Sequence, residues 1–326
     1  MRIVSLLPSA TELVCELGLR EQLVGVSHEC DYPASVKGLP TVTRSRIPAG
    51  LPSDEIDALV RSQLETDQAL YNLDLPVLAE LKPDLIVTQA LCDVCAVSAD
   101  EVDTAVCELP GRPMVVNLEP MRLSEVFDTL DLLGDAAGCP QRARQRRETL
   151  EARVHRVRER SATVARRPRV AMLEWLDPLF NAGHWTPELV DYAGGIECLG
   201  NPFAPSEQVS AATLAAADPD VVFIALCGFD LARSLEDVPR LRFVEGWDQL
   251  KAVTSEQVFL TDGNAYFSRP GPRLVDSLEI LAHALHPRVH PLPEHLPKAR
   301  KAPGIASPDR AVAPDARIRY TDVRTR

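Results

Sequence analysis

The sequence predicts an α/β fold in which two lobes, each with a mainly parallel sheet covered by helices, are joined by one long helix. Short β-branched runs alternate with amphipathic helical stretches through the 326-residue chain. The segment 82–87, Lys-Pro-Asp-Leu-Ile-Val, is echoed by 218–223, Asp-Pro-Asp-Val-Val-Phe, and a Leu-Cys pair follows shortly after each. Between the halves, residues 141–166 contain neither Gly nor Pro, as a long helix requires.

The first half begins with two predicted strands. Residues 3–6 are the first strand, and Ser9 then begins a helix, because Glu12 three residues later gives the spacing of a capping box. Residues 23–27 are the second strand. Residues 31–51 show little periodicity and hold several prolines, so we expect a long surface loop there.

The same alternation continues to the end of this half. A helix begins at Ser53, another spans 75–81, and residues 84–89 and 115–117 are the third and fourth strands. Strands separated by helices in this order favour a parallel sheet, because a parallel connection must cross over one face of the sheet.

Two helices connect the halves. Apolar residues recur at helical spacing in 123–133, and a helix over 140–166 would be about 40 Å long at 1.5 Å per residue. A helix of that length bridges two lobes, so we expect a rigid connector and not a flexible linker. The second half contains strands at 169–173, 218–223 and 258–260 and helices at 206–217 and 273–285.

These elements divide the chain into four parts. The last part is rich in proline and charged residues, which predicts a flexible tail. The parts are an N-terminal α/β lobe at 1–120, the helical connector at 121–167, a C-terminal α/β lobe at 168–287 and the tail at 288–326.

Composition limits the partners and the location. Hydrophobic residues make up 45% of the chain and charged residues 25%, as in globular proteins in general. The net charge of −12 argues against a nucleic-acid partner, since phosphate binding uses a basic face. No run of about 18 apolar residues occurs, so membrane insertion is not expected. No export signal is recognisable, which predicts a cytoplasmic protein with reduced cysteines.

Three cysteines that follow predicted strands form a candidate metal site. Cys92 and Cys95 come after the strand at 84–89, and Cys30 comes after the strand at 23–27. Two thiolates at Cys-x-x-Cys spacing can hold one metal ion, and Cys30 would add a third sulfur. Thiolates favour zinc or iron over magnesium. A redox dithiol and a purely structural loop are the alternatives.

A second set of residues is suited to a flat, largely apolar ligand. Trp175 and Trp185 are rigid aromatic side chains near a strand end, and the imidazole of His184 can bind a metal. Alternatively, both indoles belong to the core and His184 caps the helix that follows. Tyr266 and Arg269 lie in a later loop, where they would bind an amide or carboxylate of a ligand unless the loop is only a structural turn.

The remaining candidates are His28 and Glu29, which directly precede Cys30 at the end of the second strand. The sequence has no Gly-x-Gly-x-x-Gly after the first strand, no Walker-type loop and no Gly-x-Ser-x-Gly motif, so common nucleotide enzymes and serine hydrolases are disfavoured. We therefore expect a binding protein more than an enzyme. The alternative is a cytosolic metal- or thiol-dependent enzyme that uses the three cysteines.

Several segments resemble one family. The segment 2–12, Arg-Ile-Val-Ser-Leu-Leu-Pro-Ser-Ala-Thr-Glu, the segment 82–87 and the long central helix resemble the cobalamin-binding and iron-siderophore-type substrate-binding proteins of ABC importers, over about residues 1–286. Three shorter segments look like a cysteine-containing subgroup labelled cobalamin-binding proteins, namely 28–33 (His-Glu-Cys-Asp-Tyr-Pro), 91–95 (Leu-Cys-Asp-Val-Cys) and 181–185 (Asn-Ala-Gly-His-Trp).

The resemblance implies two Rossmann-like lobes of the class III periplasmic-binding-protein type. It also implies a corrinoid (cobalamin-like) or other metal-containing small molecule in the cleft between the lobes, and an ABC permease as partner. On this basis we expect the three cysteines on one wall of the cleft. The opposite wall would carry His184, Trp185, Tyr266 and Arg269.

Overall fold

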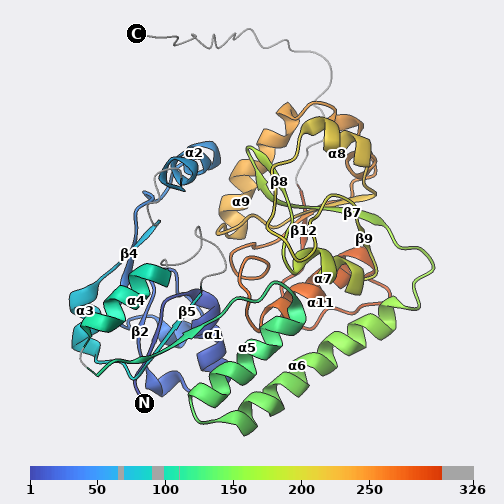
Figure 1. The fold of residues 1–326 in the computed structure, drawn as a ribbon. Coiled ribbons are helices and arrows are strands. Elements are labelled where there is room, and N and C mark those ends of the chain that lie inside the picture. The colour runs from blue at the N-terminus through green and yellow to red at the C-terminus, as the bar shows by residue number, and fades with distance from the viewer. Residues whose placement is uncertain (65–69, 90–98, 110, 303–326) are drawn as a thin grey trace, which may run out of the picture.

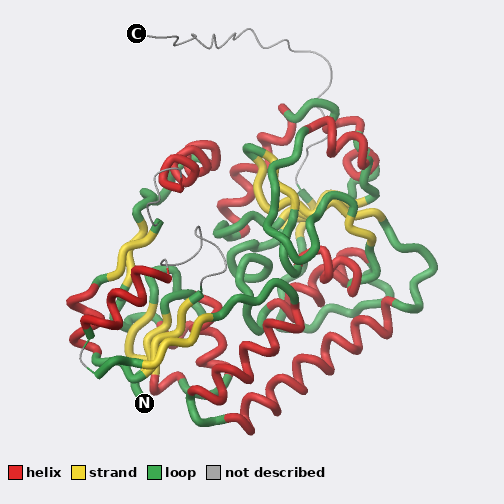
Figure 2. The backbone as a smooth tube through the Cα atoms, viewed as in Figure 1, coloured by secondary structure: helices red, strands yellow, loops and turns green. Residues whose placement is uncertain are grey.

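The computed structural model describes residues 1–64, 70–89, 99–109 and 111–302 (Figure 1). They form two α/β lobes, which lie side by side along a pair of connecting helices (Figures 1 and 2). The predicted fold class, with two lobes and mainly parallel sheets, is confirmed. Among the described helices, none combines the length and the apolar character needed to cross a bilayer.

The N-terminal lobe is built on a four-stranded parallel sheet. Side chains of alternate residues pack on opposite faces: Val4 and Ile86 contact the cluster under α3 and α4, whereas Ile3 and Val87 contact the cluster that includes α1. The strands, in sheet order, are β2 (Leu23–Val26), β1 (Ile3–Ser5), β5 (Leu85–Thr88) and β6 (Met114–Asn117). The helices are α1 (Pro8–Glu16), α3 (Leu75–Leu81) and α4 (Ala99–Glu108).

The C-terminal lobe has a mixed sheet whose central strands are parallel. The sheet order is β12-β11-β10-β7-β8, with β9 also paired to β7. Its strands are β7 (Arg169–Leu176), β8 (Leu179–Asn181), β9 (Ile196–Glu197), β10 (Val221–Ile224), β11 (Val258–Leu260) and β12 (Arg300–Lys301). Its helices are α7 (Thr186–Tyr192), α8 (Ala211–Ala217), α9 (Leu231–Asp237), α10 (Lys251–Thr254) and α11 (Leu274–Leu285).

The echoed sequence segments are equivalent interior strands. In the N-terminal lobe β5 lies between β1 and β6, and in the C-terminal lobe β10 lies between β7 and β11. All four residues of each strand are buried. Burial on both faces explains why each reads as an unbroken apolar run.

The connector consists of α5 (Leu123–Ala136) and α6 (Pro140–Ser161), which pack against each other. Gly134 permits this packing, because a Cβ atom there would collide with the side chain of Ala143. Helix α6 also contacts α7 and α11 of the C-terminal lobe, and α1 contacts α5. One hydrophobic cluster therefore runs from the N-terminal lobe through the connector into the C-terminal lobe, as a rigid link requires.

Two segments differ from the expectation. The predicted loop at 31–51 contains β3 (Thr43–Ser45), which pairs with β4 (Tyr71–Leu73) and leads to α2 (Ser53–Leu64). Residues 288–302 of the predicted tail are packed on the C-terminal lobe, because β12 pairs with β11 and Leu296 and His290 are buried, and the rest of that tail lies outside the described residues. Sequence composition does not reveal such pairing with a distant strand edge.

The central helix provides a test of the link between the lobes. Leu150 of α6 is fully buried in the shared cluster, so Leu150→Ala is expected to lower the free energy of unfolding by about 2–5 kcal/mol. The measurement is urea denaturation followed by circular dichroism. Glu148→Ala on the exposed side of α6 is the control and should change stability by less than about 0.5 kcal/mol. Equal stability of the two variants would contradict the shared core.

Candidate functional site

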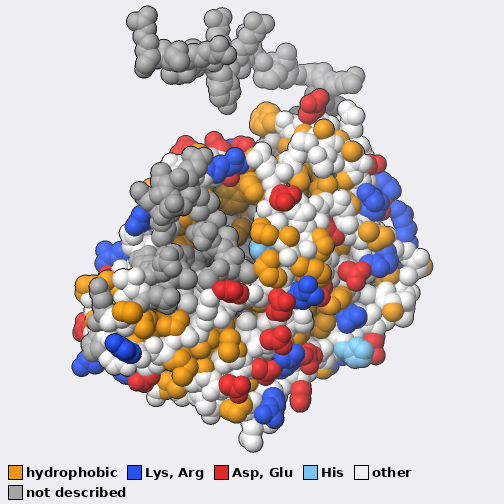
Figure 3. All heavy atoms as spheres, viewed as in Figure 1, with side chains coloured by type: hydrophobic (Ala, Val, Ile, Leu, Met, Phe, Trp, Pro, Cys, Tyr) orange, Lys and Arg blue, Asp and Glu red, His pale blue; other side chains and the backbone are white. Residues whose placement is uncertain are grey.

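The carboxyl ends of the parallel strands in the two lobes face each other. The loop after β2 carries Asp31, and the loop after β11 carries Asn264 and Arg269. Asp31 accepts a 2.6 Å hydrogen bond from Arg269 and a 3.3 Å hydrogen bond from Asn264. The space-filling view shows a recess on one face where the lobes meet (Figure 3). Strand ends of this kind are where open α/β sheets bind ligands.

Arg269 belongs to a buried ion-pair network that joins the lobes. Its guanidinium lies 3.3 Å from Glu12 Oε1, and Arg273 lies 2.6 Å from the same oxygen. Glu12 is 3% exposed and Arg269 is 6% exposed. Burial alone would raise the pKa of Asp31, but its hydrogen bond to Arg269 and the charge of that group hold the pKa below its ordinary value. Arg269 is therefore engaged with protein carboxylates, a role that the sequence did not indicate.

Tyr266 lies beside this network. The guanidinium carbon of Arg273 is 5.8 Å from the ring centre of Tyr266 and 4.1 Å from that of Tyr32. Tyr32 comes from the N-terminal lobe and is 47% exposed. Both phenols therefore lie near one cation where the lobes meet, and Tyr32 was not among the predicted residues.

His28 and Glu29 lie at the end of β2 and contact each other. His28 Nε2 is 3.2 Å from Glu29 Oε1, and this hydrogen bond lowers the pKa of Glu29. His28 Nδ1 is 2.7 Å from Thr43 Oγ1, and its ring centre is 5.1 Å from that of Tyr71. His28 thus supports the β3–β4 pair in addition to lining the strand end.

Cys30 is a partly buried thiol. Its sulfur lies 3.0 Å from Thr11 Oγ1 and 3.4 Å from Ser27 Oγ. Burial raises its pKa, so the protonated form predominates at neutral pH. Cys92 and Cys95 lie outside the described residues. Within the described ranges no group of three or more His, Cys, Asp or Glu side chains is arranged to hold a metal, and the shared metal site stays a prediction.

The two tryptophans have different surroundings. Trp185 is 5% exposed, belongs to the core cluster, and donates from Nε1 to the Phe267 carbonyl at 2.9 Å. Trp175 is only half-buried, and its ring centre is 4.9 Å from that of Phe229. The Trp175–Phe229 pair therefore offers aromatic surface at the ends of β7 and β10. Phe229 was missed, although its position just after β10 was a possible signal.

His184 is held in a constrained loop. Its φ of 52° is left-handed, its backbone N–H donates to the Ala204 carbonyl at 2.7 Å, and its Nε2 is buried without a hydrogen-bond partner among the described residues. A side chain on Gly183 would collide with the backbone of Ala204 and Ser206. Burial lowers the pKa of His184, which leaves a neutral imidazole.

Glu174 anchors this loop and was not predicted. Its Oε1 accepts hydrogen bonds from the Gly183 N–H at 3.3 Å and from Thr186 Oγ1 at 3.4 Å. Burial raises the pKa of Glu174 to about 7, despite these donors. An acidic residue inside the apolar β7 run was the available sequence signal.

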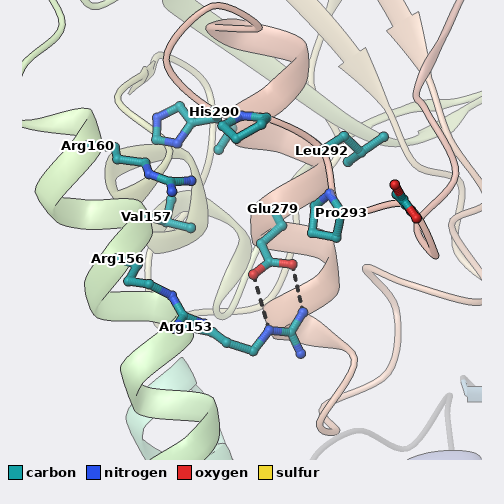
Figure 4. Close-up of a pocket in the computed structure, with 11 residues that line it drawn as sticks. Arg153, Arg156, Val157, Arg160, Glu279, His290, Leu292 and Pro293 are labelled. Carbon is teal, nitrogen blue, oxygen red and sulfur yellow. Dashed lines mark hydrogen bonds and ion pairs between the residues drawn. The ribbon is translucent and has the colours of Figure 1, made fainter.

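A separate cavity of about 340 Å³ lies between α6, α11 and residues 290–294 (Figure 4). Arg153 forms two hydrogen bonds to Glu279 there, at 3.1 and 2.7 Å. Arg156 and Arg160 line the same cavity. None of the predicted site residues contributes to it, so it is distinct from the strand ends where the candidate residues gather.

Comparisons with known proteins agree with this architecture. A family model described as periplasmic binding protein matches residues 3–265. The vitamin B12-binding protein of Vibrio cholerae is 22% identical over 85% of this chain and 86% of its own length. The uncharacterized substrate-binding lipoprotein YvrC of Bacillus subtilis is 21% identical over 88% and 80%. The crystal structure of a periplasmic heme-binding protein from Pseudomonas aeruginosa is 22% identical, with a TM-score of 0.69 over 91% of this chain and 97% of that one.

The raised pKa of Glu174 predicts a pH dependence of stability. The folded state binds the proton more tightly than the unfolded state, whose pKa is near the ordinary 4.5, so the contribution of Glu174 to stability is greatest at low pH and falls as pH rises from about 4.5 to about 7. Glu174→Gln should reduce this fall by up to about 3 kcal/mol, at about 1.4 kcal/mol per pKa unit. Urea denaturation between pH 4.5 and pH 7 measures the free energy of unfolding of both proteins. Identical slopes for the variant and the wild type would contradict the prediction.

The buried network predicts a large cost for removing one cation. Arg269→Met leaves Glu12 with only Arg273, so the free energy of unfolding should fall by about 3 kcal/mol or more. Arg166→Met is the matched control, because its exposed ion pair with Asp220 should contribute less than about 1 kcal/mol. Denaturant unfolding measures the free energy of unfolding of both variants. A loss for Arg166→Met as large as that for Arg269→Met would refute the role of burial.

Proposed function

Because the chain belongs to the periplasmic binding protein family, matched over residues 3–265, we propose that it is the substrate-binding protein of an ABC importer and holds a corrinoid between its lobes. The observation that carries the proposal is the convergence of strand ends from both lobes, tied across by the contact of Arg269 with Asp31. The vitamin B12-binding relative supports the ligand class, and YvrC supports the importer role.

The charges at the strand ends favour a neutral ligand. Four guanidiniums near them already pair with carboxylates, namely Arg269 and Arg273 with Glu12, Arg240 with Asp177, and Arg233 with Asp237. Haem and many ferric siderophores are anionic, and unpaired cations favour their binding. A corrinoid carries neutral amide groups at its periphery, so its binding does not depend on unpaired cations. This difference supports a corrinoid over haem.

The aromatic and imidazole groups suit the same ligand. Trp175 and Phe229 offer ring faces to a flat macrocycle, and His184 offers a neutral imidazole with an unpartnered nitrogen. In this proposal His28 and Glu29 contribute from the opposite lobe, next to Asp31. Cys92 and Cys95 complete the cysteine set of the prediction, with zinc or iron as the metal. The enzyme alternative gains no support, because the relatives are named as binding proteins. A cytoplasmic location stays a prediction, which cell fractionation tests.

Ligand titration tests the function. Cyanocobalamin added to the purified protein should saturate at one equivalent, with a shifted absorption spectrum whose change follows a single-site binding isotherm. Haemin and a ferric hydroxamate siderophore are the comparison ligands. Uptake of haemin or siderophore with none of cyanocobalamin would overturn the corrinoid assignment, and uptake of none of the three would overturn the proposed ligand class.

Aromatic substitutions locate the binding surface. Trp175→Ala should weaken cyanocobalamin binding about three- to tenfold, because it removes stacking worth about 0.5–1.5 kcal/mol. Met114→Ala is the control, since that side chain is 55% exposed and lies at the amino end of β6, opposite to the strand ends of the candidate site. Equal affinities of the two variants for cyanocobalamin would exclude the Trp175 side chain from the ligand-binding surface.

A further inference from the structure

The cavity between α6, α11 and residues 290–294 is large enough for a small organic molecule. Its volume of about 340 Å³ is within the range of small-molecule pockets. Helix α6 forms one wall and α11 another, and residues 290–294 complete the lining (Figure 4). All of the lining residues belong to the described part of the chain.

One stripe of α6 brings three arginines to this cavity. The stripe has the spacing i, i+3, i+4 and i+7, which places its residues on one face of a helix. Its members are Arg153, Arg156, Val157 and Arg160. Figure 4 shows the three arginine side chains extending from α6 toward α11, so their guanidiniums face the same space.

Only one of these arginines is neutralised. Arg153 lies 2.7 Å from Glu279 and 2.5 Å from Asp276. Arg156 and Arg160 form no ion pair with any carboxylate in the described ranges. Glu294, the other carboxylate in the lining, is exposed and pairs with neither of them, so water screens its charge. Two cations are therefore available to an anion in the cavity.

A buried imidazole in the lining has an unsatisfied nitrogen. His290 is 3% exposed, and its Nδ1 meets no hydrogen-bond partner among the residues described. Its Nε2 lies 3.1 Å from the hydroxyl of Ser161, for which the described ranges offer no other acceptor. Ser161 is therefore assigned as the donor to Nε2, which places the proton of the neutral ring on Nδ1.

The surroundings of His290 keep this ring neutral. Burial, followed by the charges of His286 and Arg160, lowers the pKa of His290 to about 4. Figure 4 shows the ring beside the side chain of Arg160. A buried N–H without an acceptor costs free energy, and an oxyanion next to Arg160 would supply the acceptor.

The groups in the cavity favour one class of ligand. Two cations and an N–H donor match a group with two negative charges and several acceptor oxygens, which describes a phosphate monoester better than a carboxylate. The rest of the lining suits an apolar body attached to that group. It consists of Val157, Ala282, Pro291, Leu292 and Pro293.

We propose that this cavity is a second binding site, which takes a small organic phosphate monoester through Arg156, Arg160 and the Nδ1–H of His290. The organic part of the ligand packs against Leu292 and Pro293. The site does not depend on the corrinoid proposal, because it shares no residue with the strand ends.

Calorimetric titration of the full chain with phenyl phosphate tests the site. The ligand should bind at one equivalent, more tightly than benzoate, which has one charge, and than inorganic phosphate, which lacks the ring. Arg156→Gln and Arg160→Gln should each weaken binding about tenfold or more, because each removes charge-assisted hydrogen bonds. Arg144→Gln is the control and should leave the Kd unchanged, since Arg144 is an exposed arginine near the other end of α6.

A variant with the opposite effect completes the test. Glu294→Gln removes the exposed carboxylate and should strengthen phenyl phosphate binding about two- to fivefold. Failure of the wild type to bind phenyl phosphate overturns the site, and so does an equal loss in Arg144→Gln. Benzoate or inorganic phosphate binding as tightly as phenyl phosphate overturns the ligand class. Cyanocobalamin titration of the same variants should give the wild-type Kd, so the two sites are judged separately.

Discussion

A buried carboxylate that stays ionised is stabilised by cations beside it, and Glu12 obtains two from the opposite lobe. This requirement fixes how the lobes face each other, because Arg269 and Arg273 can reach Glu12 only in one arrangement. The connector supplies the same constraint by apolar packing, since its helices share one cluster with both lobes. Together they hold the strand ends of the two sheets opposite each other, and the contacts of the candidate site that cross between the lobes depend on that placement.

The arrangement has a further effect on ligand chemistry. The cations at the meeting edge are used to join the lobes, so they are not available to bind an anion. What remains at the strand ends is aromatic and weakly polar: the Trp175–Phe229 pair, the neutral His184 and the phenol of Tyr266. In the proposed function, the same residues that make the frame rigid also favour an uncharged, flat ligand.

The sequence predicted the fold well and the site only in part. Buried strands such as β5 and β10 read as apolar runs, and the absence of Gly and Pro marked α6, because both signals are local. The roles of Arg269 and Trp185 depend on partners far along the chain, Glu12 and the Phe267 carbonyl, and no spacing rule reveals them. Glu174 and Phe229 escaped notice because their importance arises from neighbours brought together by folding.

The final strand of the C-terminal sheet affects how the molecule behaves among its own copies. If β11 were the edge strand, its unpaired backbone N–H and C=O groups could pair with a strand of another molecule. The antiparallel strand β12 covers that edge, and it is only two residues long, both exposed and positively charged. A short, positively charged edge strand repels the same strand of a second molecule. It therefore opposes edge-to-edge association of the protein.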